Sequence, residues 1–478
     1  MDYWLNLCSL VQILFYMVDA GRTSKVVVKT NIGPIQGFKV LAGSSEVAVF
    51  RGIPYAESPI GNRRFKPPVP ISEWNKVLIT SDYGNICIQS SSSTDNQTYV
   101  GDEDCLTLNI FKPMLFKKEN KNIPVIVMIH TGNFISGSSK DVNGVELAKS
   151  LESIVVTLNY RLGILGFYSM DGHIKENIGV LDQITALKWI KSNIQDFNGN
   201  PENILLIADQ ITSSIHLMSP LSRVLFSRAI SYDGESYLNP ISSYNFNFGK
   251  HRSHLEKICG PINTSGQLPV EHIVWVCLRK LSAVDLVDLS RDLVDHVLWH
   301  PFRPVYDDDV IRADSHIHSS FLHCDYMAFK SNLILPALLN RNENNTSCED
   351  IFKFAISDIA GKRFSNNKAL VKAILMSNYF PQFSNSSYDF CKAIEPLMND
   401  AITSDIISFA NHHSRTGLTF VNFASIGNHA HASTLRTHRI QSRDMACILT
   451  NQNADSCHLP DQESVGINNI VRTFLYHG

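Results

Sequence analysis

Three short runs of consecutive apolar residues stand out in the first half of the chain, at positions 125–129, 154–158 and 204–207. Continuous apolarity is typical of a strand that is buried on both faces of a sheet. Between the second and third runs, apolar positions recur at helical spacing and predict a helix over 180–194. Residues 198–203 (NGNPEN) then predict a turn. This strand–helix–strand order predicts right-handed βαβ units and an α/β protein with a mainly parallel sheet.

Composition narrows the class of protein. The chain has 478 residues, a length that by itself suggests about three domains, although single α/β domains also reach this size. Hydrophobic residues make up 44% and charged residues 18%, which excludes a disordered chain. The formal net charge is −3 and no basic run is present, so we expect no nucleic-acid partner.

The first twenty residues differ from the rest of the chain. They are apolar from Leu5 to Val18, a stretch too short to span a bilayer with ease. We interpret residues 1–20 as a secretory signal that is cleaved near Ala20, with a buried first strand or helix as the alternative. The expected folded domain is then 21–478. No other window is long and apolar enough to predict a transmembrane segment.

Sequons and cysteines agree with a secreted protein. The chain has ten cysteines, of which nine follow the predicted signal, so at least one thiol is free or pairs with another chain. Five asparagines match the N-glycosylation pattern, and most lie in polar loops. They are Asn96, Asn263, Asn344, Asn345 and Asn385.

Five strings along the chain are specific enough to indicate a family. They are residues 30–37 (TNIGPIQG), 50–68 (FRGIPYAESPIGNRRFKPP), 103–113 (EDCLTLNIFKP), 159–167 (NYRLGILGF) and 181–189 (LDQITALKW). Together they resemble type B carboxylesterases, the family that includes cholinesterases and neuroligins, over about 26–330 with weaker similarity beyond. The resemblance implies an α/β-hydrolase fold, with a large, mostly parallel central sheet and helices on both faces.

The chain departs from this family at the nucleophile. An α/β-hydrolase places its serine in a G-x-S-x-G turn after a strand. Here the turn after 204–207 reads ADQIT, so Gln210 stands at the serine position, and Ala208 and Thr212 stand at the glycine positions. A primary amide is not a nucleophile at neutral pH. Ser213 and Ser214 are the nearby hydroxyls, and we interpret both as surface or capping serines.

The other catalytic parts are also altered. The family's oxyanion-hole string reads HTGNF at 130–134, which leaves Gly132 and Asn133 as remnants of the hole, with Ile211 as the third donor position. The resemblance places the acid at Ile334, and the nearest carboxylate is Asp325. The histidine remains open among three candidates: spacing favours His438, local pattern favours His431, and His429 is close by.

We expect no metal and no cofactor. His429 and His431 lack a third ligand at suitable spacing, and Asp307 to Asp309 read as an exposed turn.

The resemblance also implies disulfide pairs. It pairs Cys87 with Cys105 and Cys259 with Cys277, and more loosely Cys447 with Cys457. A further bridge between Cys348 and Cys391 would leave Cys324 free.

The preferred hypothesis is a secreted, glycosylated and catalytically inactive member of this family that acts in protein recognition or cell adhesion, as neuroligins do. Residues 140–148 and 159–167 are closest to the neuroligin branch. The expected partner is a cell-surface or extracellular protein. Dimerisation is not expected, because the family's C-terminal helix has no counterpart after 463–478.

Two alternatives stay open. One is a working carboxylic-ester hydrolase with a displaced nucleophile or a faulty gene model at 208–218. The other is a non-catalytic binder of small apolar ligands.

Overall fold

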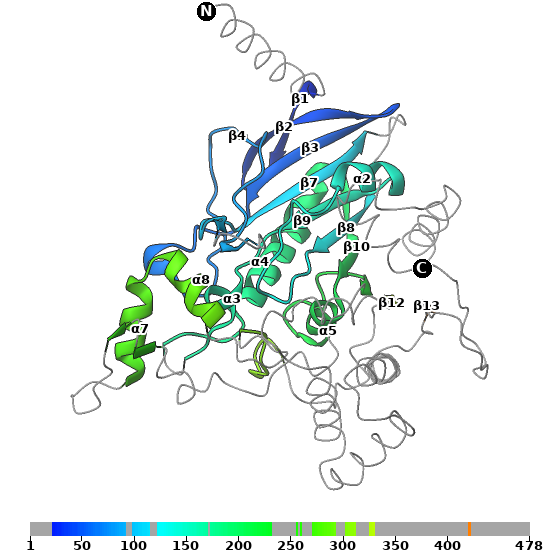
Figure 1. The fold of residues 1–478 in the computed structure, drawn as a ribbon. Coiled ribbons are helices and arrows are strands. Elements are labelled where there is room, and N and C mark those ends of the chain that lie inside the picture. Colours follow the sequence, from blue (N-terminus) through cyan, green and yellow to red (C-terminus); the bar gives the residue numbers. More distant parts are fainter. Residues whose placement is uncertain are drawn as a thin grey trace, which may run out of the picture.

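The computed structural model contains a single large twisted sheet with helices packed against it (Figure 1). The residues that the structure describes are 22–91, 98–114, 122–170, 173–231, 255–256, 259–260, 270–292, 302–311, 325–329 and 419–421.

The sheet has eleven strands. In spatial order they are β1 (Arg22–Thr30), β2 (Gly33–Ala42), β3 (Ser45–Pro54), β7 (Thr107–Met114), β9 (Ile154–Leu158), β8 (Ile123–Ile129), β10 (Gly199–Ala208), β11 (Arg228–Ser231), β12 (Asp325–Phe329) and β13 (Thr419–Val421), with β4 (Leu78–Ile79) beside β2. A separate two-stranded sheet pairs β5 (Gln89–Ser90) with β6 (Tyr99–Val100).

Strand direction divides the main sheet into two parts. Along the path from β1 to β9 the neighbouring pairs are antiparallel, and from β9 through β8 to β13 they are parallel. The short β4 beside β2 is also parallel to its neighbour. The three apolar runs are β8, β9 and β10, and they pair in parallel as predicted. The turn predicted over 198–203 is shorter than expected, because β10 begins at Gly199 and only its register shifts before Ile204.

The described helices lie between and after these strands. They are α2 (Gly144–Leu151), α3 (Gly163–Phe167), α4 (Ile178–Asn193), α5 (Gln210–Met218), α7 (Val270–Lys280) and α8 (Ala283–Asp292), with the short 3₁₀ helices η1 (Gly61–Arg63) and η2 (Ile194–Phe197). Helix α4 is the one predicted over 180–194, and it begins two residues earlier.

Buried side chains form two clusters, one on each face of the sheet, because successive strand residues point in opposite directions. Along β8, Val125, Val127 and Ile129 belong to the first cluster, which also holds side chains of α4, α5 and α8. Ile126 and Met128 belong to the second, where α2 packs. Helices therefore cover both faces, as the resemblance implies for an α/β-hydrolase.

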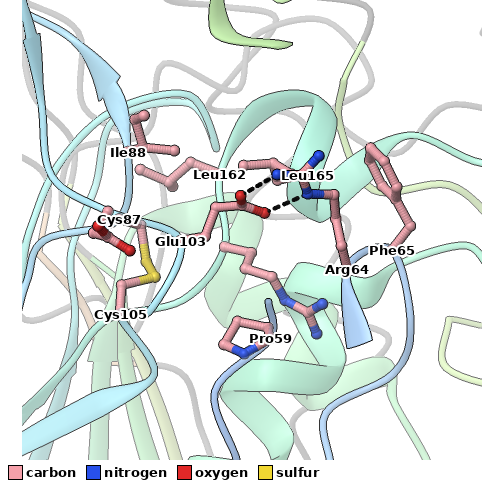
Figure 2. Close-up of a pocket in the computed structure, with 11 residues that line it drawn as sticks. Pro59, Arg64, Phe65, Cys87, Ile88, Glu103, Cys105, Leu162 and Leu165 are labelled. Atoms are coloured by element: carbon pink, nitrogen blue, oxygen red, sulfur yellow. Dashed lines mark hydrogen bonds and ion pairs between the residues drawn. A yellow bond between two sulfur atoms is a disulfide. The ribbon is translucent and has the colours of Figure 1, made fainter. Parts of the chain in front are cut away.

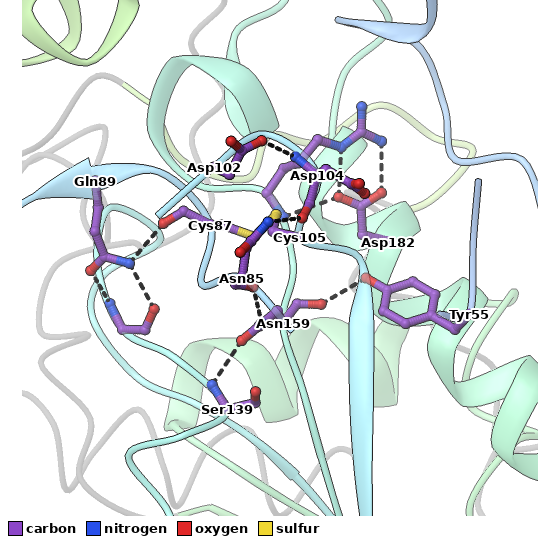
Figure 3. The surroundings of a disulfide bond; sticks show 12 residues. Tyr55, Asn85, Cys87, Gln89, Asp102, Asp104, Cys105, Ser139, Asn159 and Asp182 are labelled. Atoms are coloured by element: carbon purple, nitrogen blue, oxygen red, sulfur yellow. Dashed lines mark hydrogen bonds and ion pairs between the residues drawn. A yellow bond between two sulfur atoms is a disulfide. The ribbon is translucent and has the colours of Figure 1, made fainter. Parts of the chain in front are cut away.

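Two disulfides are present in the described part of the chain, Cys87–Cys105 and Cys259–Cys277. These are the two pairs that the family resemblance implies. Figure 3 shows the first bridge beside Asn159, whose side chain donates to Asn85 O at 2.9 Å and accepts from Ser139 N at 2.8 Å. The bridge therefore lies in a segment that is also held by hydrogen bonds to the end of β9.

Several predicted features lie outside the described residues. They are the signal at 1–20, the sequons at Asn96, Asn263, Asn344, Asn345 and Asn385, and the cysteines Cys324, Cys348, Cys391, Cys447 and Cys457. In the part that is described, no helix combines the length and apolarity needed to cross a membrane.

Candidate functional site

The turn between β10 and α5 is the place where an α/β-hydrolase carries its nucleophile. Here α5 begins at Gln210, and Asp209 before it is extended, with φ −62° and ψ 168°. Asp209 Oδ1 accepts the Thr212 N–H at 2.8 Å, and the Thr212 hydroxyl donates to Asp209 Oδ2 at 3.1 Å. A carboxylate that caps a helix in this way stabilises amide groups that the first turn leaves without partners. The turn is thus closed by a polar cap at a place where the family uses glycines.

The hydroxyl of Ser213 in α5 does not reach the surface. Ser213 is fully buried, and its hydroxyl donates to Ala208 O at 3.3 Å and lies 3.5 Å from Ile230 O. The interpretation of Ser213 as a surface or capping serine is therefore wrong, because the side chain fills the space between β10, α5 and β11. A hydroxyl in that position has no route to a substrate.

The loop that follows β8 keeps an unusual backbone. Gly132, Asn133 and Phe134 all have positive φ, at 126°, 53° and 63°. A Cβ on Gly132 would lie 2.1 Å from Ser136 O, so only glycine fits there. Asn133 adopts the left-handed region at lower cost than most residues do, whereas an aromatic residue rarely adopts it. Backbone of this kind persists where neighbouring groups hold it in place.

Those neighbouring groups can be identified. The Phe134 carbonyl accepts the Gly163 N–H at 2.7 Å, and the Phe134 ring packs against Phe167 at 4.9 Å between centroids. At the far end of the loop, Gln89 both accepts the Gly137 N–H at 2.8 Å and donates to Gly137 O at 2.9 Å. Three segments therefore hold the loop in its conformation.

The two polar backbone atoms of Gly132 differ in their hydrogen bonding. Within the described residues, the Gly132 N–H has no hydrogen-bond acceptor, while its carbonyl accepts from Ile135 N and Ser136 N at 3.0 and 3.1 Å. A backbone N–H without a partner can bind an anion or a developing negative charge. The assignment of Gly132 to an oxyanion hole stays a prediction. In the turn from Ala208 to Thr212, Thr212 is the residue with a hydroxyl, and this hydroxyl is buried and bonded to Asp209.

His130 precedes this loop and is buried. Its ring stacks on Tyr160 at 4.5 Å, and its Nδ1 lies 2.9 Å from Thr131 O. Burial lowers the pKa of His130 from 6.5 to about 4, so the ring is neutral at pH 7. The His130 ring packs against Tyr160 at the start of the loop and is shielded from solvent.

A second buried histidine was not anticipated from the sequence. His216 of α5 places Nδ1 3.0 Å from Ser222 Oγ and Nε2 2.9 Å from Gln183 Oε1 of α4. Serine, imidazole and amide thus form a chain like that of a hydrolase, but all three side chains are fully buried. Burial lowers the pKa of His216 from 6.5 to about 3. The group joins α4, α5 and the segment after α5, and no signal in the sequence distinguishes it from other polar positions.

A small cavity beside the first disulfide is filled by an ion pair. Arg64 binds both Glu103 oxygens (Figure 2). Its Nη1 also donates to Arg279 O and Leu281 O, at 3.1 and 2.6 Å. Both charged side chains are 11% exposed. The remaining space is about 10 Å³, room for about one water. Arg64 therefore links the disulfide segment to the end of α7 and leaves no room for a ligand.

The remaining predicted catalytic positions are not placed. Ile334, His429, His431 and His438 lie outside the described residues, although β12 and β13, the strands before them, are present. Among the side chains that are described, no three His, Cys, Asp or Glu residues converge on a point that could hold a metal ion.

Solved structures contain the same fold. A thermophilic PNB esterase superimposes with a TM-score of 0.71 over 95% of this chain and 91% of its own, at 23% identity. At that identity the match establishes the α/β-hydrolase fold and nothing about activity.

Curated proteins match the chain over part of their length. Rabbit (Oryctolagus cuniculus) liver carboxylesterase 1 is 33% identical over 304 residues, which is 60% of this chain and 52% of that protein. Acetylcholinesterase from Electrophorus electricus is 33% identical over 296 residues, 58% of this chain and 46% of that protein. The chain thus spans about half the length of these relatives. The family model described as "Carboxylesterase family" matches residues 24–474, nearly the whole chain, and so this protein belongs to the carboxylesterase family.

Proposed function

We propose that this protein is a non-hydrolytic member of the carboxylesterase family that acts outside the cell by recognising another protein, as neuroligins do. In this proposal the protein has the fold of the family, but its function is binding through its surface and not hydrolysis, since fold and function can separate.

The turn between β10 and α5 carries this proposal. Gln210 occupies the position of the family's serine, and Asp209 caps the helix that starts there. The serine-type hydrolysis of this family goes through an acyl intermediate and needs an activated hydroxyl at that point. The closest candidates, Thr212 and Ser213, are buried and hydrogen-bonded, so the geometry supports binding over ester cleavage.

Two features support the extracellular setting. Disulfides persist in oxidising compartments, and the described chain has two. The apolar N-terminal stretch and the five sequons agree with passage through the secretory route. The partner that fits this setting is a cell-surface or extracellular protein.

Hydrolysis is tested on the full chain secreted from animal cells. The protein is incubated with a fluorophosphonate probe and with p-nitrophenyl butyrate, beside rabbit liver carboxylesterase 1 as the positive control and a heat-denatured sample as the negative control. We expect labelling and turnover at the level of the denatured sample. Stoichiometric labelling of a serine, located by peptide mass spectrometry, would overturn the proposal in favour of an esterase with a displaced nucleophile.

Recognition is tested separately. Full-length protein is measured by biolayer interferometry against a panel of purified cell-surface ectodomains, with the reduced and denatured chain as the matched control. We expect saturable binding to at least one ectodomain that the denatured chain does not show. Absence of such binding across the panel, with hydrolysis also absent, would refute the recognition part alone.

A further inference from the structure

Strand β1 forms one end of the main sheet. In the described part of the chain, β2 pairs with one side of β1 and no strand pairs with the other (Figure 1). The unpaired side of such a strand presents a row of backbone N–H and C=O groups that can pair with another extended chain. Strands β2, β3, β7 and β9 separate this edge from β8, so it is distant from the loop and the turn where the family carries its catalytic groups.

The register with β2 shows which backbone groups face this edge. A two-residue turn at 31–32 joins the strands, and the pair that closes such a hairpin, here Thr30 with Gly33, is hydrogen-bonded. Hydrogen-bonded and non-hydrogen-bonded pairs alternate along antiparallel strands. The residues at the intervening positions therefore direct their N–H and C=O groups away from β2, toward the free edge. They are Lys25, Val27 and Lys29.

The side chains of β1 differ between the two faces of the sheet. One face carries the exposed side chains of Lys25, Val27 and Lys29. The other face carries Val26 and Val28, which are half-buried and pack against the first core cluster. A strand that is added at this edge would place its own side chains alternately beside the lysines and beside the half-buried valines.

Charge restricts which chain can add here. The charged residues of β1 are Arg22, Lys25 and Lys29, and β2 contributes Lys39, so these two strands hold four basic residues and no acidic one. Two copies of β1 that paired in antiparallel fashion around Val27 would bring Lys25 of one copy opposite Lys29 of the other, which disfavours self-pairing. Carboxylates at the same positions of a different chain would be attracted instead.

We propose that the free edge of β1 binds an extended segment of a partner protein in which acidic and apolar residues alternate, and that this segment adds to the sheet as a further strand. Backbone hydrogen bonds to Lys25, Val27 and Lys29 supply the affinity, while the lysines on one face and the valines on the other select the sequence. The inference deepens the proposed recognition function by naming its surface, and it rests on that function for the existence of a natural partner.

The first test measures the binding of three fluorescein-labelled peptides to the full-length secreted protein by fluorescence anisotropy. Their sequences are EVEVEVE, KVKVKVK and EPEPEPE, each equal in length to Ser24–Thr30. We expect EVEVEVE to bind at least about tenfold more tightly than either of the others, because KVKVKVK repeats the charge of β1 and the prolines of EPEPEPE lack N–H donors. Equal binding of EPEPEPE would show that charge alone attracts the peptide. That result, or no binding of EVEVEVE, would overturn the proposal.

The second test exchanges the charge of the edge. The double variant Lys25→Glu with Lys29→Glu should reverse the preference, so that KVKVKVK binds more tightly than EVEVEVE. The matched control is Lys188→Glu with Lys280→Glu, which makes the same change in net charge at exposed positions of α4 and α7 and should keep the original preference. Near-ultraviolet circular dichroism confirms that both variants fold. If the two double variants behaved alike, the peptide would be responding to net charge, and the edge would be refuted as the site.

The third test removes one backbone donor from the edge. Val27→Pro deletes an N–H that points away from β2, so the pairing of β1 with β2 is kept. We expect at least about tenfold weaker binding of EVEVEVE, whereas Val27→Thr, which retains the N–H, should stay within about twofold of the unaltered protein. Unchanged binding in folded Val27→Pro would overturn the proposal. A dimer of the full chain in sedimentation velocity that Val27→Pro abolishes would also overturn it, because a second copy would then occupy the edge.

Failure of this inference can be distinguished from failure of the recognition function. Binding of EVEVEVE at the edge, with no partner found among the ectodomains, would support the edge site and count against the recognition function. Binding of an ectodomain that neither excess EVEVEVE nor the Lys25→Glu with Lys29→Glu variant weakens would support recognition and overturn the edge as its surface.

Discussion

The loop after β8 and the turn after β10 follow neighbouring parallel strands at the same edge of the sheet, but they differ in how their backbone is held. The loop has three consecutive residues with positive φ, which Gln89, Gly163 and Phe167 keep in place from outside. The turn has an extended Asp209 and a helix that its own carboxylate caps. The loop is therefore maintained by tertiary contacts, and the turn by local hydrogen bonds.

The comparison shows which parts of an active site can change alone. A turn stabilised locally tolerates new residues as long as they cap the helix, as Asp209 and Thr212 do. A loop held by several other segments cannot relax without disturbing them. In this chain an unusual loop backbone therefore lies beside a turn that its own carboxylate caps.

The largest expected effect is a loss of folding stability at low pH, because a buried neutral histidine lies next to each region: His130 before the loop and His216 in the helix after the turn. Burial lowers the pKa of His130 to about 4 and that of His216 to about 3, against about 6.5 when unfolded. The unfolded chain then binds more protons below pH 6.5, so stability is complete above that pH and is lost on acidification toward the folded pKa values. We expect about 2 kcal/mol of loss from each histidine between about pH 7.5 and pH 5.

Urea unfolding at a series of pH values measures this loss. His130→Phe and His216→Phe should each remove about half of the histidine contribution to the slope, whatever their effect at pH 7.5. A slope that neither substitution changes would show that these rings are accessible to protons in the folded state.

The next largest effect is the destabilisation caused by a side chain at Gly132, which measures how tightly the loop backbone is held. In Gly132→Ala the new Cβ would meet Ser136 O at 2.1 Å while φ is 126°, so backbone strain and overlap add to about 3 kcal/mol of destabilisation. Gly61→Ala is the matched control, since Gly61 also has positive φ, at 56°, but nothing within 4 Å. It should cost about 1 kcal/mol. Equal losses of unfolding free energy in the two variants would mean that the loop is not held by its neighbours.

A smaller effect isolates the cap of the turn. Asp209→Ala removes a cap that is 9% exposed, and we expect about 1.5 kcal/mol of destabilisation. Asn143→Ala removes the cap of α2, an exposed hydrogen bond of 3.3 Å to Glu146 N, and should cost about 0.5 kcal/mol. Chemical denaturation of both variants gives the comparison. If Asp209→Ala were neutral, local capping would not be what holds the turn.

The smallest effect concerns Ser213. Its hydroxyl makes only long hydrogen bonds, and alanine is the better helix former, so Ser213→Ala should change the unfolding free energy by less than about 0.5 kcal/mol. Differential scanning calorimetry is sensitive enough to show it. A loss near 3 kcal/mol would indicate that the hydroxyl is part of a tighter polar network.

Much of the fold was predictable from local pattern. Continuous apolar runs identified β8, β9 and β10 because parallel strands are covered on both faces. Helical spacing located α4 to within two residues. The turn over 198–203 was predicted too long, since Asn and Gly favour a turn locally, whereas pairing with β8 extends the strand to Gly199.

The sequence predicted the candidate site only at positions where the type of residue alone decides which chemistry is possible. Gln210 at the position where the family resemblance places the serine is read from the sequence alone, and it is the basis of the proposal that the protein is not a hydrolase. The buried chain of Ser222, His216 and Gln183 was not predictable, because its members come from three segments and none has a distinctive neighbour in sequence. The interior position of Ser213 was missed for the same reason.

The sequence by itself determined three central strands, one helix, the family, and which residues stand at the family's nucleophile motif, since these depend on residue type and spacing along the chain. Tertiary structure decided which residues of that motif are accessible and which backbone is strained, because burial and positive φ depend on segments that pack from far along the chain.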